Sequence, residues 1–204
     1  MRNIEKYIFG LSCDLDSVHY DIKNDFITFF KIDKVKFASN IRLTINHNAD
    51  RVIADTKNND LKLVQLGSLL FFRLRVDNEK HLEAYNSVLN GKLKHCSYMI
   101  RKTNVTPCND IMKSFKDNSN DRFEMVEGVV FEICLTDSPR DANTFATTDR
   151  QHALIRNIDW SKSVELTETK DYWHEFLEFE EISMELEDLG KMLNKVNERL
   201  LKLK

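Results

Sequence analysis

The chain has 204 residues, of which 42% are hydrophobic and 31% charged, and its formal net charge is -3. This composition allows a buried core, excludes a chain disordered by composition, and disfavours nucleic-acid binding, which needs a basic excess. No apolar run reaches the roughly 18 residues of a membrane span, and the first residues lack the apolar core of a signal peptide, so we expect a cytoplasmic protein.

The first half of the chain predicts β-structure. Short segments rich in Ile, Phe, Val and Leu are typical of strands; they are residues 4–11, 25–32, 41–46, 61–65 and 68–76. In the last of these, Leu70, Phe72 and Leu74 alternate with Phe71 and Arg73, which is strand periodicity.

The middle of the chain predicts one helix and two further strands. Residues 78–90 predict a helix that begins at Asn78, a good N-cap, and ends before Gly91, a good C-terminal cap. Leu82, Tyr85 and Leu89 fall on one face, which is expected to be its apolar side. Strands are expected at about 94–101 and 128–136. The polar stretch between them, 103–121, contains Pro107 and predicts a loop or flap.

The C-terminal segment predicts a long helix with an apolar seam. From Asp171 onward, large apolar residues are spaced alternately by three and four. They are Phe179, Ile182, Leu186, Leu189, Leu193, Val196, Leu200 and Leu203. We expect a coiled coil with a partner, or alternatively a helix packed on its own domain. The predicted division is therefore a domain at 1–164 and a helical tail at 165–204.

A serine protease needs a nucleophilic hydroxyl, a base, a group that orients the base, and donors for the oxyanion. The chain has no G-x-S-x-G elbow, which disfavours an α/β-hydrolase. Residues 43–48 (Leu-Thr-Ile-Asn-His-Asn) and the strand and hairpin that follow resemble a block of the tailed-phage prohead protease family. The catalytic base of that family is the histidine of this block, and His47 occupies its place.

Two further segments resemble the same family in the same order. In residues 88–100, a helix, a Gly turn and a strand lead to Ser97, which falls on the catalytic serine. Residues 131–139 (Phe-Glu-Ile-Cys-Leu-Thr-Asp-Ser-Pro) are similar to the third block, which is usually Glu-Val-Ser-Leu-Val followed by Pro. The family is related in fold to the herpesvirus assemblins, whose third catalytic residue stands where Glu132 stands here. The same relation places the oxyanion donor at the backbone N–H of Arg140.

The resemblance implies an α+β fold with a mostly antiparallel, assemblin-like β-barrel, flanking helices and the helical tail. It implies a serine endopeptidase with Ser97, His47 and Glu132 as triad, and no metal or cofactor. The implied partner is the major capsid protein precursor or the scaffold protein, and the implied location is the assembling prohead in the host cytoplasm. We also expect a homo-oligomer and neither nucleic-acid nor membrane partners.

The pattern also leaves alternatives open. The family usually has Gly two residues before the serine and a small residue two after it, whereas this chain has His95 and Met99. The same fold could therefore serve as a catalytically inactive capsid-assembly or scaffolding module. An unrelated ligand-binding barrel, in which His47 and Ser97 would not meet, is a third possibility.

Other residues compete for the catalytic roles. Asp137 and, behind it, Asp141 are the alternatives to Glu132. The four cysteines form no C-x-x-C pair and have no zinc-finger spacing, which indicates reduced thiols; they are Cys13, Cys96, Cys108 and Cys134. Cys96 adjoins Ser97, but its side chain is expected on the opposite face of the strand.

Overall fold

The computed structural model describes residues 5–16, 19–21, 26–108, 122–139, 141–168 and 170–177. The contacts of the chain divide it into two compact units, 1–170 and 171–204. Residues 173–177 of the second unit are helical, whereas residues 178–204, which carry nearly all of the heptad seam, lie outside the described residues. The coiled coil therefore stays a prediction.

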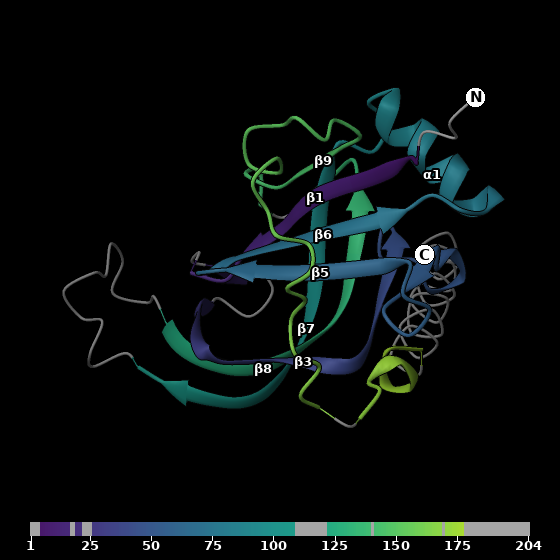
Figure 1. Ribbon diagram of the computed structural model, residues 1–204. Coiled ribbons are helices and arrows are strands. Elements are labelled where there is room, and N and C mark those ends of the chain that lie inside the picture. The colour runs from purple at the N-terminus through teal and green to yellow at the C-terminus, as the bar shows by residue number, and fades with distance from the viewer. Residues whose placement is uncertain are drawn as a thin grey trace, which may run out of the picture. The chain divides into compact units, whose positions relative to one another are not determined.

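One sheet of the first unit is antiparallel throughout and has the strand order β5-β6-β1-β9 (Figure 1). Its strands are β1 (Tyr7–Asp14), β5 (Leu61–Leu66), β6 (Leu69–Arg75) and β9 (Phe145–Thr147). In β6, Leu70, Phe72 and Leu74 are fully buried as their alternation predicts, but Phe71 between them is buried too. β1 is buried at six successive residues.

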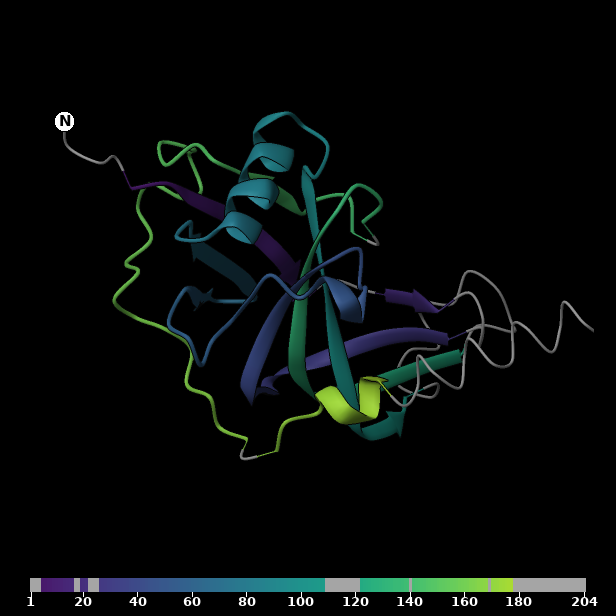
Figure 2. The same ribbon diagram turned by 90° about the vertical axis from the view of Figure 1, so that its right-hand side faces the viewer.

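The second sheet carries the candidate site and has the order β2-β3-β8-β7, with β4 paired to β3. Its strands are β2 (His19–Asp21), β3 (Phe26–Ile45), β4 (Ala54–Asp55), β7 (His95–Pro107) and β8 (Arg122–Thr136). β3 and β8 run parallel, whereas the other strand pairs of this sheet are antiparallel. In Figure 2, β7 (teal) and β8 (green) lie side by side along most of their length.

The expected closed barrel is wrong for the described part of the chain, where the strands form two sheets. The two sheets meet where β7 passes the turn before β9, and no continuous ladder of backbone hydrogen bonds joins these two described segments. One backbone bond joins Ala146 N to Lys94 O, at 2.9 Å. Next to it, the side chain of Thr144 rather than a strand binds the backbone of Cys96. Its Oγ1 accepts a hydrogen bond from Cys96 N and donates one to Cys96 O. The α+β class and the mostly antiparallel pairing are confirmed.

Three strands are longer than the sequence predicts, and one of them is β8, which begins at Arg122 rather than at about 128. The strands expected at 25–32 and 41–46 are the ends of a single strand, β3, and the predicted loop at 103–121 is wrong in its first residues. β7 continues to Pro107 because the β-branched residues Val105 and Thr106 pair with Val126 and Met125 of β8. Residues 109–121 lie outside the described residues.

The helix is confirmed as α1 (Glu79–Leu89), but its predicted apolar face is wrong: Leu82 and Leu89 are exposed, and the buried residues are His81, Ala84 and Val88. The side chain of its N-cap, Asn78, accepts a hydrogen bond from His81 N at 3.0 Å. Gly91, just after the helix, has a φ of 69°, the left-handed conformation that favours glycine at this position. Among the described residues, no helix is long and apolar enough to cross a membrane.

The two sheets approach closely where β1 passes β7. A Cβ atom on Gly10 would lie 2.4 Å from the Phe72 ring and 2.8 Å from Cys96 Sγ, distances at which atoms overlap. Glycine is therefore required here by space, since any larger residue would push the strands apart. This close approach fixes the start of β7, and with it the position of Ser97, against the first sheet.

Candidate active site

His47 lies in a tight turn just after the end of β3. Asn46 and His47 both have a positive φ, 54° and 53°, a conformation uncommon for non-glycine residues but several-fold enriched in Asn and His. The turn is held from two sides. Asn46 N donates to Leu135 O of β8 at 2.9 Å, and the Asn48 side chain accepts from Asp50 N at 2.8 Å. The sequence thus forms a fixed turn that presents the imidazole over β8.

Glu132 on β8 meets this imidazole from inside the protein. Its side chain is fully buried. One carboxylate oxygen, Oε2, lies 2.7 Å from His47 Nδ1, and the other, Oε1, accepts a short hydrogen bond from Thr44 Oγ1. Asp137, the alternative, is exposed. A buried carboxylate with both oxygens occupied holds the ring in one orientation and favours a proton on Nδ1.

The second ring nitrogen of His47 faces a cysteine. Nε2 lies 3.3 Å from Cys134 Sγ, within hydrogen-bonding distance for sulfur. Cys134 is fully buried and stands directly opposite Ser97 in the antiparallel β7–β8 pair. Because cross-strand partners project from the same face of a sheet, Ser97, Cys134 and Glu132 share one face. In this structure the Cys134 thiol, rather than the Ser97 hydroxyl, occupies the hydrogen-bonding position at Nε2.

Sequence reasoning treated Cys134 as an ordinary reduced thiol. A signal was present, because residues two apart on a strand lie on the same face, and Cys134 is two residues after Glu132. Its contact with His47 depended on the β3–β8 register, which the sequence does not state.

The surroundings of His47 favour its charged form. Burial opposes the imidazolium, but hydrogen bonds to Cys134 and to Glu132, with the negative charge of Glu132, outweigh it and raise the pKa of His47 to about 10. The physical reason is that a buried carboxylate is costly unless it is paired with a positive charge. At neutral pH the imidazole is therefore protonated in this arrangement.

This leads to a pH prediction. Because only the neutral imidazole can accept a proton, any base function of His47 should increase as the pH rises above the ordinary histidine value of about 6.5. We expect an NMR titration of the His47 ring to have its midpoint well above that value, and the midpoint to fall in Cys134→Ala, which removes one hydrogen bond. A midpoint at or below about 6.5 in the unmodified protein would contradict the prediction.

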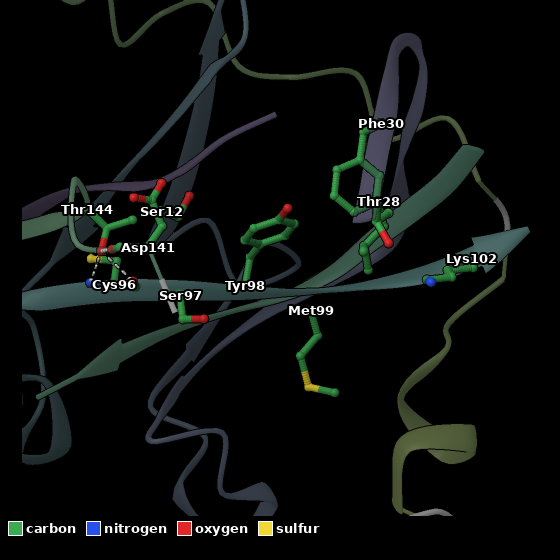
Figure 3. Close-up of a pocket in the computed structure, with 11 residues that line it drawn as sticks. Ser12, Thr28, Phe30, Cys96, Ser97, Tyr98, Met99, Lys102, Asp141 and Thr144 are labelled. Atoms are coloured by element: carbon green, nitrogen blue, oxygen red, sulfur yellow. Dashed lines mark hydrogen bonds between the residues drawn. The ribbon is translucent and has the colours of Figure 1, made fainter. Parts of the chain in front are cut away.

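A cavity of about 210 Å³ adjoins Ser97 along β7. Figure 3 shows Tyr98 and Met99 projecting from opposite sides of the strand, with Ser97 between Cys96 and Tyr98. The cavity is lined by Ser12, Thr28, Phe30, Cys96, Ser97, Tyr98, Met99, Ile100, Lys102, Asp141 and Thr144. Ser97 is 9% exposed and is one of the residues that line this cavity.

The structure describes the surroundings of Cys96, His95 and Met99, but not those of Arg140. Cys96 lies on the opposite face of β7 from Ser97, and burial raises the pKa of its thiol well above the usual value, which makes it a poor nucleophile. His95 Nδ1 donates to Thr144 O at 2.8 Å and anchors the start of β7. Met99 stands opposite Glu132. Arg140, the predicted oxyanion residue, lies outside the described residues.

Comparison with protein families gave one match: the model of the caudovirus prohead serine proteases matches residues 16–157, more than half of the chain. This range contains the turn of His47, the strands that carry Ser97 and Glu132, and Cys134. Comparisons with curated proteins and with solved structures gave no match.

Proposed function

The chain belongs to the caudovirus prohead serine protease family, and from this premise we propose that it is an endopeptidase in which Ser97 attacks the scissile carbonyl. His47 acts as general base, and Glu132 orients the imidazole and stabilises its charged form. The substrate is the major capsid protein precursor or the scaffold protein, cleaved inside the assembling prohead.

One observation carries the assignment of roles: the 2.7 Å contact between the buried Glu132 carboxylate and His47 Nδ1, on the sheet face that Ser97 shares. A histidine whose Nδ1 is bound to a buried carboxylate is suited to accept a proton at Nε2. The same contact supports Glu132 over Asp137, which is exposed.

Ser97 must reach Nε2 for the reaction to begin. In this structure that nitrogen contacts Cys134, whose strand neighbour across the β7–β8 pair is Ser97. We propose that a small rotation of the imidazole moves Nε2 from the Cys134 thiol to the Ser97 hydroxyl when substrate fills the adjoining cavity. The serine proton then passes to Nε2 as the carbonyl is attacked, and later passes to the leaving amine. The backbone N–H of Arg140 is our proposed oxyanion donor.

The proposal is tested with a fluorophosphonate probe, which reacts with activated serines. We expect one covalent adduct, located on Ser97 by peptide mass spectrometry. Ser97→Ala should lose it, whereas Ser87→Ala, which alters a serine on the exposed side of α1, should keep it. A folded protein that gains no adduct at alkaline pH, where His47 is neutral, would instead favour the inactive capsid-assembly module.

A further inference from the structure

Outside the proposed proteolytic reaction, the groups around His47 have a second chemical capacity. Three potential metal ligands, His47, Glu132 and Cys134, place one ligand atom each within 4.8 Å of one another. Imidazole nitrogen together with thiolate sulfur is a ligand set that suits Zn²⁺ and other thiophilic divalent cations. We propose that His47 Nε2 and Cys134 Sγ form a binding site for a thiophilic divalent cation, with Zn²⁺ as its natural occupant.

The distances support direct ligation by these two atoms. A tetrahedral zinc ion with Zn–N of about 2.0–2.1 Å and Zn–S of about 2.3 Å sets its nitrogen and sulfur ligands about 3.6 Å apart. In the structure Nε2 and Sγ are 3.3 Å apart. A cation therefore fits between them after a movement of a few tenths of an ångström, in place of the hydrogen that now joins them.

Glu132 supports the site by binding the ring nitrogen of His47 that does not face Cys134. A metal-bound histidine almost always donates its second ring N–H to a carboxylate or carbonyl, which fixes the ring and raises the basicity of the ligating nitrogen. Glu132 makes this contact with Nδ1 at 2.7 Å and is itself held by Thr44. The ring is therefore oriented for a metal at Nε2 before any metal binds.

A second cluster of potential metal ligands in the described residues differs from this site in how its histidine is bound. Asp60, Asp77 and His81 also lie close enough to share an ion. There, however, Nδ1 of His81 contacts Asp77 at 2.9 Å and Nε2 contacts Ile53 O at 2.7 Å. Both ring nitrogens are thus engaged by oxygen acceptors, which leaves that imidazole a structural role. His47 differs because its second nitrogen faces a thiol, itself a metal ligand once it loses its proton.

The site has two strong protein ligands, so the ion is exchangeable rather than structural. Water and the hydroxyl of Ser97, which stands opposite Cys134 in the β7–β8 pair, would supply the other two tetrahedral positions. A bound ion removes Nε2 from proton transfer. Its effect, if the proposed function holds, is reversible inhibition of proteolysis. Because a thiol and a protonated imidazole must lose protons to bind the metal, affinity should rise with pH.

The test uses Co²⁺ as a spectroscopic probe and Zn²⁺ in calorimetry, on the full-length protein at mildly alkaline pH. We expect one Co²⁺ per chain with a thiolate-to-metal charge-transfer band, and displacement of the band by Zn²⁺. Cys134→Ser and His47→Gln should abolish the band. Cys108→Ser, which alters a similarly buried thiol beyond the end of β7, should keep it. Glu132→Gln should weaken Zn²⁺ binding about 10- to 100-fold.

Absence of a thiolate band in the folded, unmodified protein would overturn the proposal, as would a band that survives Cys134→Ser. Zn²⁺ binding that is lost in Asp77→Asn but kept in Cys134→Ser would place the ion at the second cluster and overturn it too. These readouts need no proteolytic activity. The metal site can therefore fail while the protease assignment holds, and Ser97→Ala can lose proteolysis while the thiolate band remains.

Discussion

Ser97→Ala should lower kcat/KM for cleavage of a capsid precursor about 10⁶-fold and leave the fold intact. The substitution removes a single hydroxyl, and losing the nucleophile of a catalytic triad costs about this much because covalent catalysis then stops. The residual rate would come from substrate binding and oxyanion stabilisation alone. Cleavage is measured on co-expressed precursor by gel and, for rates, on a purified precursor fragment. Circular dichroism checks the fold.

The decisive control is Cys134→Ala, because Cys134 is the group that His47 contacts in this structure. If Ser97 is the nucleophile, Cys134→Ala should still cleave, with its pH profile shifted to lower pH since the pKa of His47 falls. The opposite pattern, in which Cys134→Ala is inactive and Ser97→Ala cleaves normally, would identify a cysteine nucleophile and refute the serine assignment.

Local sequence patterns predicted the parts of this molecule that depend on neighbours in the chain. The bounds of helix α1 were predictable because Asn78 and Gly91 mark its ends. Its buried face was not, because the apolar spacing selects Leu82 and Leu89, which are exposed. The strand pattern of residues 68–76 likewise appears as β6. Barrel closure was not predictable in this way, because it depends on whether two distant strands form a ladder. Here the side chain of Thr144 meets Cys96 instead.

The candidate site, like the fold, was predictable only where it did not depend on the pairing of distant strands. The order of the three blocks allowed His47, Ser97 and Glu132 to be selected, and the structure brings His47 and Glu132 within 2.7 Å. Cys134 could not be assigned a contact from sequence, because its approach to His47 depends on how β8 pairs with β3. The parallel β3–β8 register sets the His47 turn beside β8, and the antiparallel β7–β8 register sets Ser97 opposite Cys134. A slip of one residue between β7 and β8 would turn Ser97 to the face opposite Cys134.

Glu132→Gln should lower kcat/KM about 10⁴-fold, less than the loss of the nucleophile, while the protein remains folded. The amide keeps the shape of the carboxylate but loses the charge that stabilises the imidazolium, and it no longer selects the ring form with a proton on Nδ1. Both the hydrogen bond and the charge of Glu132 raise the pKa of His47. The pKa of His47 should therefore fall, and the remaining activity should reach its plateau at lower pH.

The matched control is Asp137→Asn, which makes the same chemical change at an exposed carboxylate five residues further along the chain. It should leave kcat/KM within a few-fold of the original, and the pKa of His47 unchanged in an NMR titration. Both variants remove one negative charge, and only Glu132→Gln alters a group that contacts the imidazole. The two measurements together therefore separate the effect of orienting the His47 ring from the effect of the protein's net charge. If Asp137→Asn proves far more damaging than Glu132→Gln, the orienting carboxylate is Asp137, and the buried pair of His47 and Glu132 has a purely structural role.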